Sequence, residues 1–169
     1  MTTVFVSKSL GLAMTDSRVT ESTPRFFAGF FPLTHSVRYK VTNQKALYIH
    51  DRLFVAAGDV STINRVIRYL VNHEEVLVTK NTPECECMLI GKDYAIYMCV
   101  FKGKFHKKTI FFGDNWVSIL GSGYDAIAHL KYSTRHNPLI FTAEHVIEEF
   151  RKVKDKDKYT DDNINLYRI

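Results

Sequence analysis

The hydrophobic pattern of this chain switches between strand and helix periods in a definite order, and that order restricts the folds open to it. Alternating apolar residues predict a short strand at residues 4–6 with a hairpin partner at 11–15. Residues 46–57 predict two more strands joined by a tight turn. A helical spacing of apolar residues comes next, with Asp59 or Ser61 as the expected N-cap.

The second half of the chain continues with strands, then two helices, then a last strand. The expected elements are strands at 86–90, 94–101, 109–112 and 117–120, helices at 124–132 and 142–154, and a strand at 165–169. Hairpins imply antiparallel sheets, and helices grouped between blocks of strands cover the outer faces of packed sheets. The pattern therefore predicts an α+β protein, with two antiparallel sheets flanked by helices in a single domain over residues 1–169.

Composition is that of a globular protein without a membrane segment. The chain has 169 residues, of which 46% are hydrophobic and 13% aromatic. Its net charge of +5 is spread along the sequence and predicts no specific nucleic-acid partner. No apolar run reaches the roughly 20 residues that cross a bilayer, and no signal peptide is evident. We therefore expect a cytoplasmic protein.

The cysteines and histidines do not form a recognisable metal site. Cys85, Cys87 and Cys99 are odd in number, and the first two share one face of an expected strand. Their spacing is short for zinc ligands, so buried, reduced strand cysteines are expected. His145 and Glu148 lack an evident third ligand. Neither a P-loop nor a dinucleotide-binding motif is present, so we expect no cofactor.

Removal of Met1 would place a threonine at the start of the first strand. The hydroxyl of an N-terminal Thr2 can attack a carbonyl carbon, and its own free α-amine can accept the proton. An α-amine has a pKa of about 7.7–8.0, so a usable neutral fraction exists near pH 7. While Met1 remains attached, that amine is an amide and cannot act as a base.

Four short stretches, spread over most of the chain, carry a family pattern in the right order and spacing. They are Thr2-Thr3, residues 15–20 (TDSRVT), residues 45–54 (KALYIHDRLF) and Gly121-Ser122-Gly123 before a helix. The second is similar to Asp-Ser-Arg-Ala-Thr and the third to Lys-x-x-x-Ile-His-Asp-Arg-Ile-Phe. Together they resemble the N-terminal-nucleophile hydrolases of proteasome type, which include proteasome β-subunits and the peptidase HslV.

The resemblance implies a four-layer α-β-β-α sandwich and a threonine peptidase. Thr2 would be the nucleophile, and Lys45 beside it would lower the pKa of its amine and hydroxyl. Asp16 would hold that lysine charged and oriented, and Ser122 would hydrogen-bond the Thr2 amine. The backbone N–H of Gly58 would stabilise the oxyanion.

The resemblance also suggests substrates and partners. Either Ala56 or Ala57 would shape the specificity pocket, and both are small and uncharged, so we expect a bulky apolar residue at the cleaved position. Peptides or unfolded proteins would be the substrate, processed inside a homo-oligomeric ring. Any dependence on ATP would come from a separate ATPase unfoldase.

The chain departs from the family pattern at two places. Residues 21–36 form an extra segment that holds four phenylalanines in six residues, and either a buried hairpin or a contact with another subunit or partner would account for it. β-subunits carry a supporting Asp-Gly-Ser-Ser-Gly stretch, where this chain has residues 160–164 (TDDNI). Asp161 can replace the aspartate of that stretch, but the serine is absent.

These departures leave two alternatives to a peptidase. One is a catalytically inactive protein of the same fold that binds partners or self-assembles. The other is a hydrolase for a different amide, such as a small acylated amine. Loss of Met1 and turnover of peptides separate the first from a peptidase, and substrate profiling separates the second.

Overall fold

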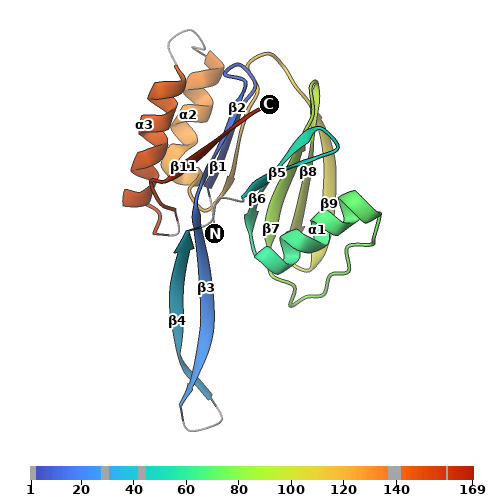
Figure 1. Cartoon of the computed structure of the whole chain (residues 1–169), viewed down its shortest axis with the longest axis vertical. Coiled ribbons are helices and arrows are strands. Elements are labelled where there is room, and N and C mark those ends of the chain that lie inside the picture. Colours follow the sequence, from blue (N-terminus) through green and yellow to red (C-terminus); the bar gives the residue numbers. More distant parts are fainter. Residues whose placement is uncertain (1–2, 28–30, 42–44, 137–141, 159) are drawn as a thin grey trace.

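The computed structural model describes residues 3–27, 31–41, 45–136, 142–158 and 160–169, with the side chains of 18–41 and 132–136 left out. Its elements are β1 (Thr3–Ser7), β2 (Leu12–Asp16), β3 (Arg18–Phe27), β4 (Phe31–Val41), β5 (Ala46–Ile49), β6 (Arg52–Gly58), α1 (Val60–Asn72), β7 (Cys85–Ile90), β8 (Tyr94–Phe101), β9 (Lys104–Phe111), β10 (Val117–Gly121), α2 (Tyr124–His136), α3 (Ala143–Arg151), the 3₁₀ turn η1 (Lys152–Asp155) and β11 (Ile164–Arg168). Figure 1 shows two sheets packed between helices.

Both sheets of the sandwich are antiparallel. The first has the order β10-β1-β2-β11, and the second has the order β5-β6-β7-β8-β9. The first strand pairs along both of its edges, with Thr3 opposite Gly121 on β10 and Val4 opposite Thr15 on β2. This register brings the N-terminal end of β1, the last residues of β2 and the end of β10 to one end of the sheet.

Three apolar layers hold the sandwich together. Between the sheets, Val4, Val6 and Leu120 pack against side chains such as Leu53 and Met88. The outer face of the five-stranded sheet is covered by α1, and the outer face of the other sheet is covered by α2 and α3 (Figure 1). The two antiparallel sheets flanked by helices that the order of elements predicts, and the four-layer α-β-β-α sandwich that the family resemblance implies, are therefore confirmed.

A long hairpin, formed by β3 and β4, extends away from the sandwich (Figure 1). Its strands pair from Arg18 opposite Val41 to Phe27 opposite Phe31, with a register shift between Arg25 and Phe26. The predicted extra segment at residues 21–36 makes up most of this hairpin. Phe30, one of its four phenylalanines, lies outside the described residues.

The structure corrects some expected boundaries. β9 begins at Lys104 rather than at 109, because main-chain pairing with β8 carries a strand whose Lys-rich sequence has little apolar alternation. The helix expected to run from 142 to 154 ends at Arg151 and continues as η1. Among the described residues, no helix is both long and apolar enough to cross a bilayer.

Asp59 starts α1 immediately after Gly58. Its Oδ1 accepts hydrogen bonds from the Thr62 N–H at 2.9 Å and from the Ser61 hydroxyl. Burial raises the pKa of Asp59, but these hydrogen bonds outweigh that effect and hold the pKa below its ordinary value. The carboxylate therefore contributes stability above the ordinary pKa of about 3.9, and this contribution is lost as the pH falls through the lowered value.

We expect Asp59→Ala to lower the free energy of unfolding by about 1 kcal/mol at pH 7, because the N-cap is lost. The difference in the free energy of unfolding between wild type and Asp59→Ala should shrink at pH values below the pKa that Asp59 has in the folded protein, because the wild-type carboxylate is then protonated. Urea denaturation at several pH values measures both effects. Asp59→Asn is the matched control, since it keeps the cap without the titration. A deficit independent of pH would contradict this account.

Candidate active site

A buried ion pair lies at the end of the sandwich where β2 ends and β5 begins. Lys45 Nζ is 2.8 Å from Asp16 Oδ2, and the two side chains are 7% and 0% exposed. These residues are 29 positions apart in sequence and are separated by the whole hairpin. Burial of two opposite charges together fixes their geometry tightly, because either charge alone would be costly to bury.

The same carboxylate also contacts the first strand. Asp16 Oδ1 accepts the backbone N–H of Thr3 at 3.0 Å. The nitrogen of Thr3 belongs to the peptide bond that joins it to residue 2, so the ion pair is tied to the chain directly at the predicted nucleophile. Thr2 itself lies outside the described residues, and so do the contacts predicted for it with Lys45 and Ser122.

A second set of hydrogen bonds reaches the side chain of Thr3. The Ser122 hydroxyl donates to Asp157 Oδ2 at 2.5 Å, and the Thr160 hydroxyl donates to the same oxygen at 2.7 Å. Thr160 Oγ1 is in turn 2.7 Å from Thr3 Oγ1. Ser122 is therefore brought to the site through Asp157 and Thr160, which the sequence analysis did not single out.

A sequence signal for Asp157 and Thr160 does exist. They stand three positions apart as an acid followed by a hydroxyl residue, which is the spacing of the Asp and second Ser in Asp-Gly-Ser-Ser-Gly. Residues 160–164 resemble that stretch less well, and they contain Asp161, the predicted supporting aspartate. In the structure, Asp161 accepts the backbone N–H of Ser17 at 3.0 Å and its hydroxyl at 2.9 Å. It thereby anchors the residue that follows Asp16.

Gly58 ends β6 in a conformation that requires glycine. Its φ is 122°, and a Cβ here would lie 2.6 Å from the Cys85 Cα and the Glu84 carbonyl oxygen. The Asp59 N–H bonds to the Glu84 oxygen at 3.1 Å, which marks Gly58 and Cys85 as a non-hydrogen-bonded pair. The N–H of Gly58 therefore points away from β7, toward the side of the sheet where Lys45 precedes β5.

The two alanines before Gly58 lie in different environments. Ala56 packs under α1 with Phe54 and Cys87. Ala57 faces the other sheet and lines a cavity of about 470 Å³ together with Gly121 and Ser122. Of the two predicted specificity residues, Ala57 is the one that shares a cavity with a predicted site residue.

The cysteines lie where the expected strand pattern puts them. Cys85 and Cys87 are buried on one face of β7, with their sulfur atoms 3.9 Å apart, and Cys99 is half-buried on β8. The hydrogen bond from Cys87 lowers the pKa of the Cys85 thiol, although burial opposes this effect. Among the described residues, no group of histidines, cysteines and carboxylates is arranged to hold a metal ion.

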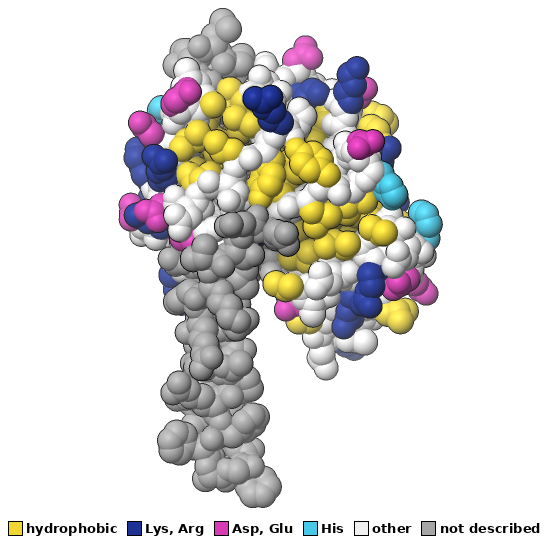
Figure 2. Space-filling view, in the orientation of Figure 1, with side chains coloured by type: hydrophobic (Ala, Val, Ile, Leu, Met, Phe, Trp, Pro, Cys, Tyr) yellow, Lys and Arg dark blue, Asp and Glu magenta, His cyan; other side chains and the backbone are white. Residues whose placement is uncertain are grey.

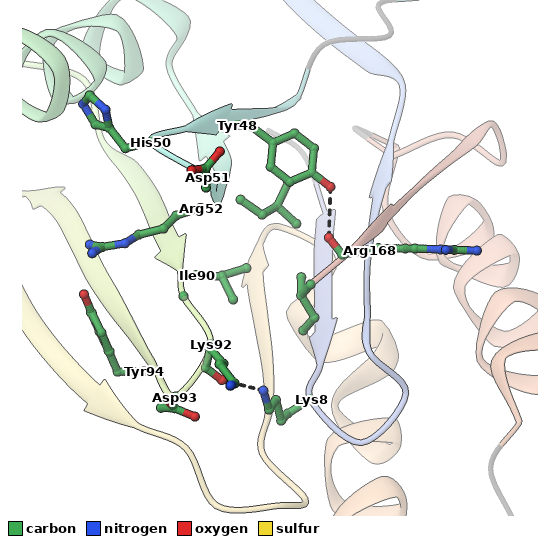
Figure 3. A pocket seen from close by; sticks show the side chains of 13 residues that line it. Lys8, Tyr48, His50, Asp51, Arg52, Ile90, Lys92, Asp93, Tyr94 and Arg168 are labelled. Carbon is green, nitrogen blue, oxygen red and sulfur yellow. Dashed lines mark hydrogen bonds between the residues drawn. The ribbon is translucent and has the colours of Figure 1, made fainter.

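A different cavity, of about 460 Å³, lies at the other end of β1 (Figure 3). Lys8 Nζ donates to the Lys92 carbonyl oxygen on one side, and the Tyr48 hydroxyl donates to the Arg168 carbonyl oxygen at 3.0 Å on the other. The Arg52 guanidinium lies 5.3 Å from the centre of the Tyr94 ring. None of the predicted site residues lines this cavity within the described part of the chain.

Comparison with known proteins identifies the fold. No known family profile matches the sequence, and no curated protein matches it. Two solved structures are similar over nearly their whole length: HslV from Trypanosoma brucei (12% identity, TM-score 0.54, 98% of this chain and 97% of that chain) and BPH from Thiobacillus denitrificans in complex with epoxomicin (9% identity, TM-score 0.54, 99% and 97%). The chain therefore has the same fold as HslV and BPH.

Removing one member of the buried ion pair should destabilise the protein strongly. We expect Lys45→Met to lower the free energy of unfolding by about 3 kcal/mol, because the Asp16 carboxylate stays buried without its counter-charge. The double variant Asp16→Asn/Lys45→Met should regain much of this loss. Urea denaturation of the two single variants, the double variant and wild type completes the cycle. Additive losses would show that the two charges are not coupled.

Proposed function

We propose that this chain is a threonine peptidase whose nucleophile is the Thr2 hydroxyl, exposed by removal of Met1. The observation that carries the proposal is the buried Asp16–Lys45 pair, which is tied to the Thr3 N–H at the start of β1. A fixed cation at this place lowers the pKa of a neighbouring amine and hydroxyl, which is what an N-terminal nucleophile needs. The fold shared with HslV and with the epoxomicin complex of BPH supports the same chemistry.

The reaction has two covalent steps. The Thr2 amine accepts the hydroxyl proton as Oγ attacks the carbonyl carbon of the scissile peptide, and the N–H of Gly58 stabilises the resulting oxyanion. The amine then delivers that proton to the leaving nitrogen, the C–N bond breaks, and an acyl ester on Thr2 remains. Water attacks the ester with the same amine as base, which releases the acid and restores Thr2.

The remaining site residues orient these groups. Asp16 keeps Lys45 charged and in place. A series of hydrogen bonds holds the turn after β10 against the first strand. It runs from Ser122 through Asp157 and Thr160 to Thr3. Asp161 anchors Ser17 and so fixes the end of β2.

Assembly into a homo-oligomeric ring, with peptides or unfolded proteins as substrate, completes the proposal. Exposed apolar side chains lie on edge strands of both sheets, with Leu47 and Tyr48 on β5 and Leu166 on β11. Figure 2 shows apolar side chains gathered on one face of the sandwich. Such surfaces are typical of protein contacts. A separate ATPase would supply unfolding, and we propose the cytoplasm as the site of action.

The projecting hairpin favours a second candidate, a protein of this fold that binds partners without catalysis. A two-stranded hairpin is only marginally stable alone in water, so β3 and β4 are expected to gain stability from another chain. Both proposals include this contact, and they differ in whether Met1 is removed and Thr2 reacts.

Intact mass and covalent labelling test the proposal directly. We expect purified protein to lack Met1 and to gain the mass of one epoxomicin per chain, because the freed Thr2 is the reactive group. Thr2→Ala should gain none, and it should reduce hydrolysis of fluorogenic peptides to background. Native mass spectrometry of the same samples reports the subunit number. A retained Met1, or equal turnover by Thr2→Ala, would favour the non-catalytic candidate.

A panel of peptides that differ only at the cleaved residue tests specificity. We expect leucine, phenylalanine or tyrosine to be cut at least about 10-fold faster than glutamate, because Ala57 leaves room for a bulky side chain and the Glu84 and Glu86 carboxylates on the same cavity repel an acidic one. Ala57→Leu should reduce turnover of the largest residues, while Ala56→Gly serves as the control on the other face of β6. Fastest cleavage after a charged residue would contradict this expectation.

A further inference from the structure

Glu86 belongs to the five-stranded sheet, but its carboxylate makes a direct contact with the other sheet. Glu86 lies on β7, and its Oε2 accepts the backbone N–H of Gly121, the last residue of β10, at 2.8 Å. Its Oε1 accepts the Tyr97 hydroxyl from neighbouring β8, also at 2.8 Å. Both carboxylate oxygens are thus engaged, one within its own sheet and one across the sandwich.

The group that Glu86 holds is the turn that carries Ser122. Gly121 is the Cα partner of Thr3 in the first sheet and has a φ of 88°. Gly123, at the other end of the turn, lies so close to Thr3 that a Cβ there would approach the threonine Oγ1 to 2.1 Å. A shift of this turn would therefore move Ser122 and disturb the start of β1 together.

A cavity lies beside this contact. Its volume is about 470 Å³, and Ala57, Glu86, Tyr97 and Gly121 all line it. Apolar packing across a cavity is weak, whereas a hydrogen bond from a backbone N–H to a carboxylate is charge-assisted. The Glu86–Gly121 contact is consequently well placed to set the distance between the sheets beside the site.

Tyr97 fixes the direction of this contact. Burial raises the pKa of the Tyr97 phenol, and the hydrogen bond to Glu86 raises it further, so the hydroxyl stays protonated and donates. One oxygen of Glu86 is thereby occupied, which turns the other toward Gly121.

Strand β7 contacts both Gly58 and the turn that carries Ser122. On β7, Cys85 is the partner of Gly58, and the next residue, Glu86, is the partner of Ala57. Close packing of Cys85 against Gly58 sets the position of the proposed oxyanion donor. Glu86, on the same strand, sets the position of the Ser122 turn. The distance between Gly58 and this turn therefore depends on β7.

We propose that Glu86 is a positioning residue, which holds the Gly121-Ser122 turn at its working distance from Gly58 through the Gly121 N–H. This proposal rests on the proposed peptidase function for its kinetic consequences. Its structural content, a carboxylate that restrains the Gly121 amide, is independent of catalysis.

The kinetic consequence of the proposal is tested by measuring peptide hydrolysis for three variants in the same assembly state as the wild type. We expect Glu86→Ala to reduce kcat at least about 10-fold with KM within about 3-fold, because misplaced groups slow the reaction more than they weaken binding. Glu86→Gln should keep kcat within about 3-fold, since its amide oxygen can accept from Gly121 and its NH₂ can donate to the Tyr97 oxygen. Tyr97→Phe should lie between the two.

Glu74→Ala is the matched control. The Glu74 carboxylate lies 3.7 Å from the Arg68 guanidinium, just beyond the end of α1, and does not line the cavity beside Gly121, so its removal should leave kcat unchanged. Equal losses for Glu86→Ala and Glu86→Gln would overturn the proposal, as would a full kcat in a folded Glu86→Ala.

Hydrogen exchange of the Gly121 amide, followed by NMR, tests the contact without any reaction. We expect exchange at least about 10-fold faster in Glu86→Ala than in wild type, and unchanged in Glu74→Ala, because only the first variant removes the acceptor. If Glu86→Ala does not fold, Tyr97→Phe provides the same measurement with a smaller expected increase. If the Gly121 amide exchanges at the wild-type rate in both Glu86→Ala and Tyr97→Phe, the proposal is overturned. An inactive wild type with fast exchange in Glu86→Ala would overturn the peptidase function and leave the restraint standing.

Discussion

The buried pair of Asp16 and Lys45 is the interaction on which this end of the molecule depends. Asp16 is the last residue of β2 in one sheet, and Lys45 directly precedes β5 in the other. The ion pair therefore connects the two sheets. The Thr3 N–H also donates to the carboxylate. Because a buried charge without its partner is costly, the fold and the chemistry of the site stabilise the same geometry.

Around this pair, the sandwich provides further support. Asp161 fixes Ser17, the residue after Asp16. Asp157 and Thr160, which follow the last helical turn, connect Ser122 to Thr3. These contacts come from segments far apart in the chain and converge on one strand end. An arrangement of this kind preorganises polar groups, which is what stabilisation of a developing charge requires.

Local patterns in the sequence were enough to predict the layered fold, whereas contacts between segments were not. Asp16, Lys45 and Ser122 stand in stretches with a family pattern. Asp157 was missed because it lies in a lysine-rich run that is typical of a solvated helix end. Glu86 alternates with cysteines on an ordinary strand, and only the packing of the two sheets shows that it contacts Gly121. β9 was predicted too short because its pairing with β8, and not its own pattern, defines it.

The position of the long hairpin in the chain has a mechanical consequence. Its first strand starts at Arg18, two residues after Asp16, and its second strand ends at Val41, shortly before Lys45. The base of the hairpin is therefore bounded by the two charges of the buried pair. A molecule held at the outer end of β3 and β4 would therefore bind a segment whose two ends lie close in sequence to Asp16 and to Lys45, so binding at a remote surface and the geometry of the interior charges would be connected through the same stretch of chain.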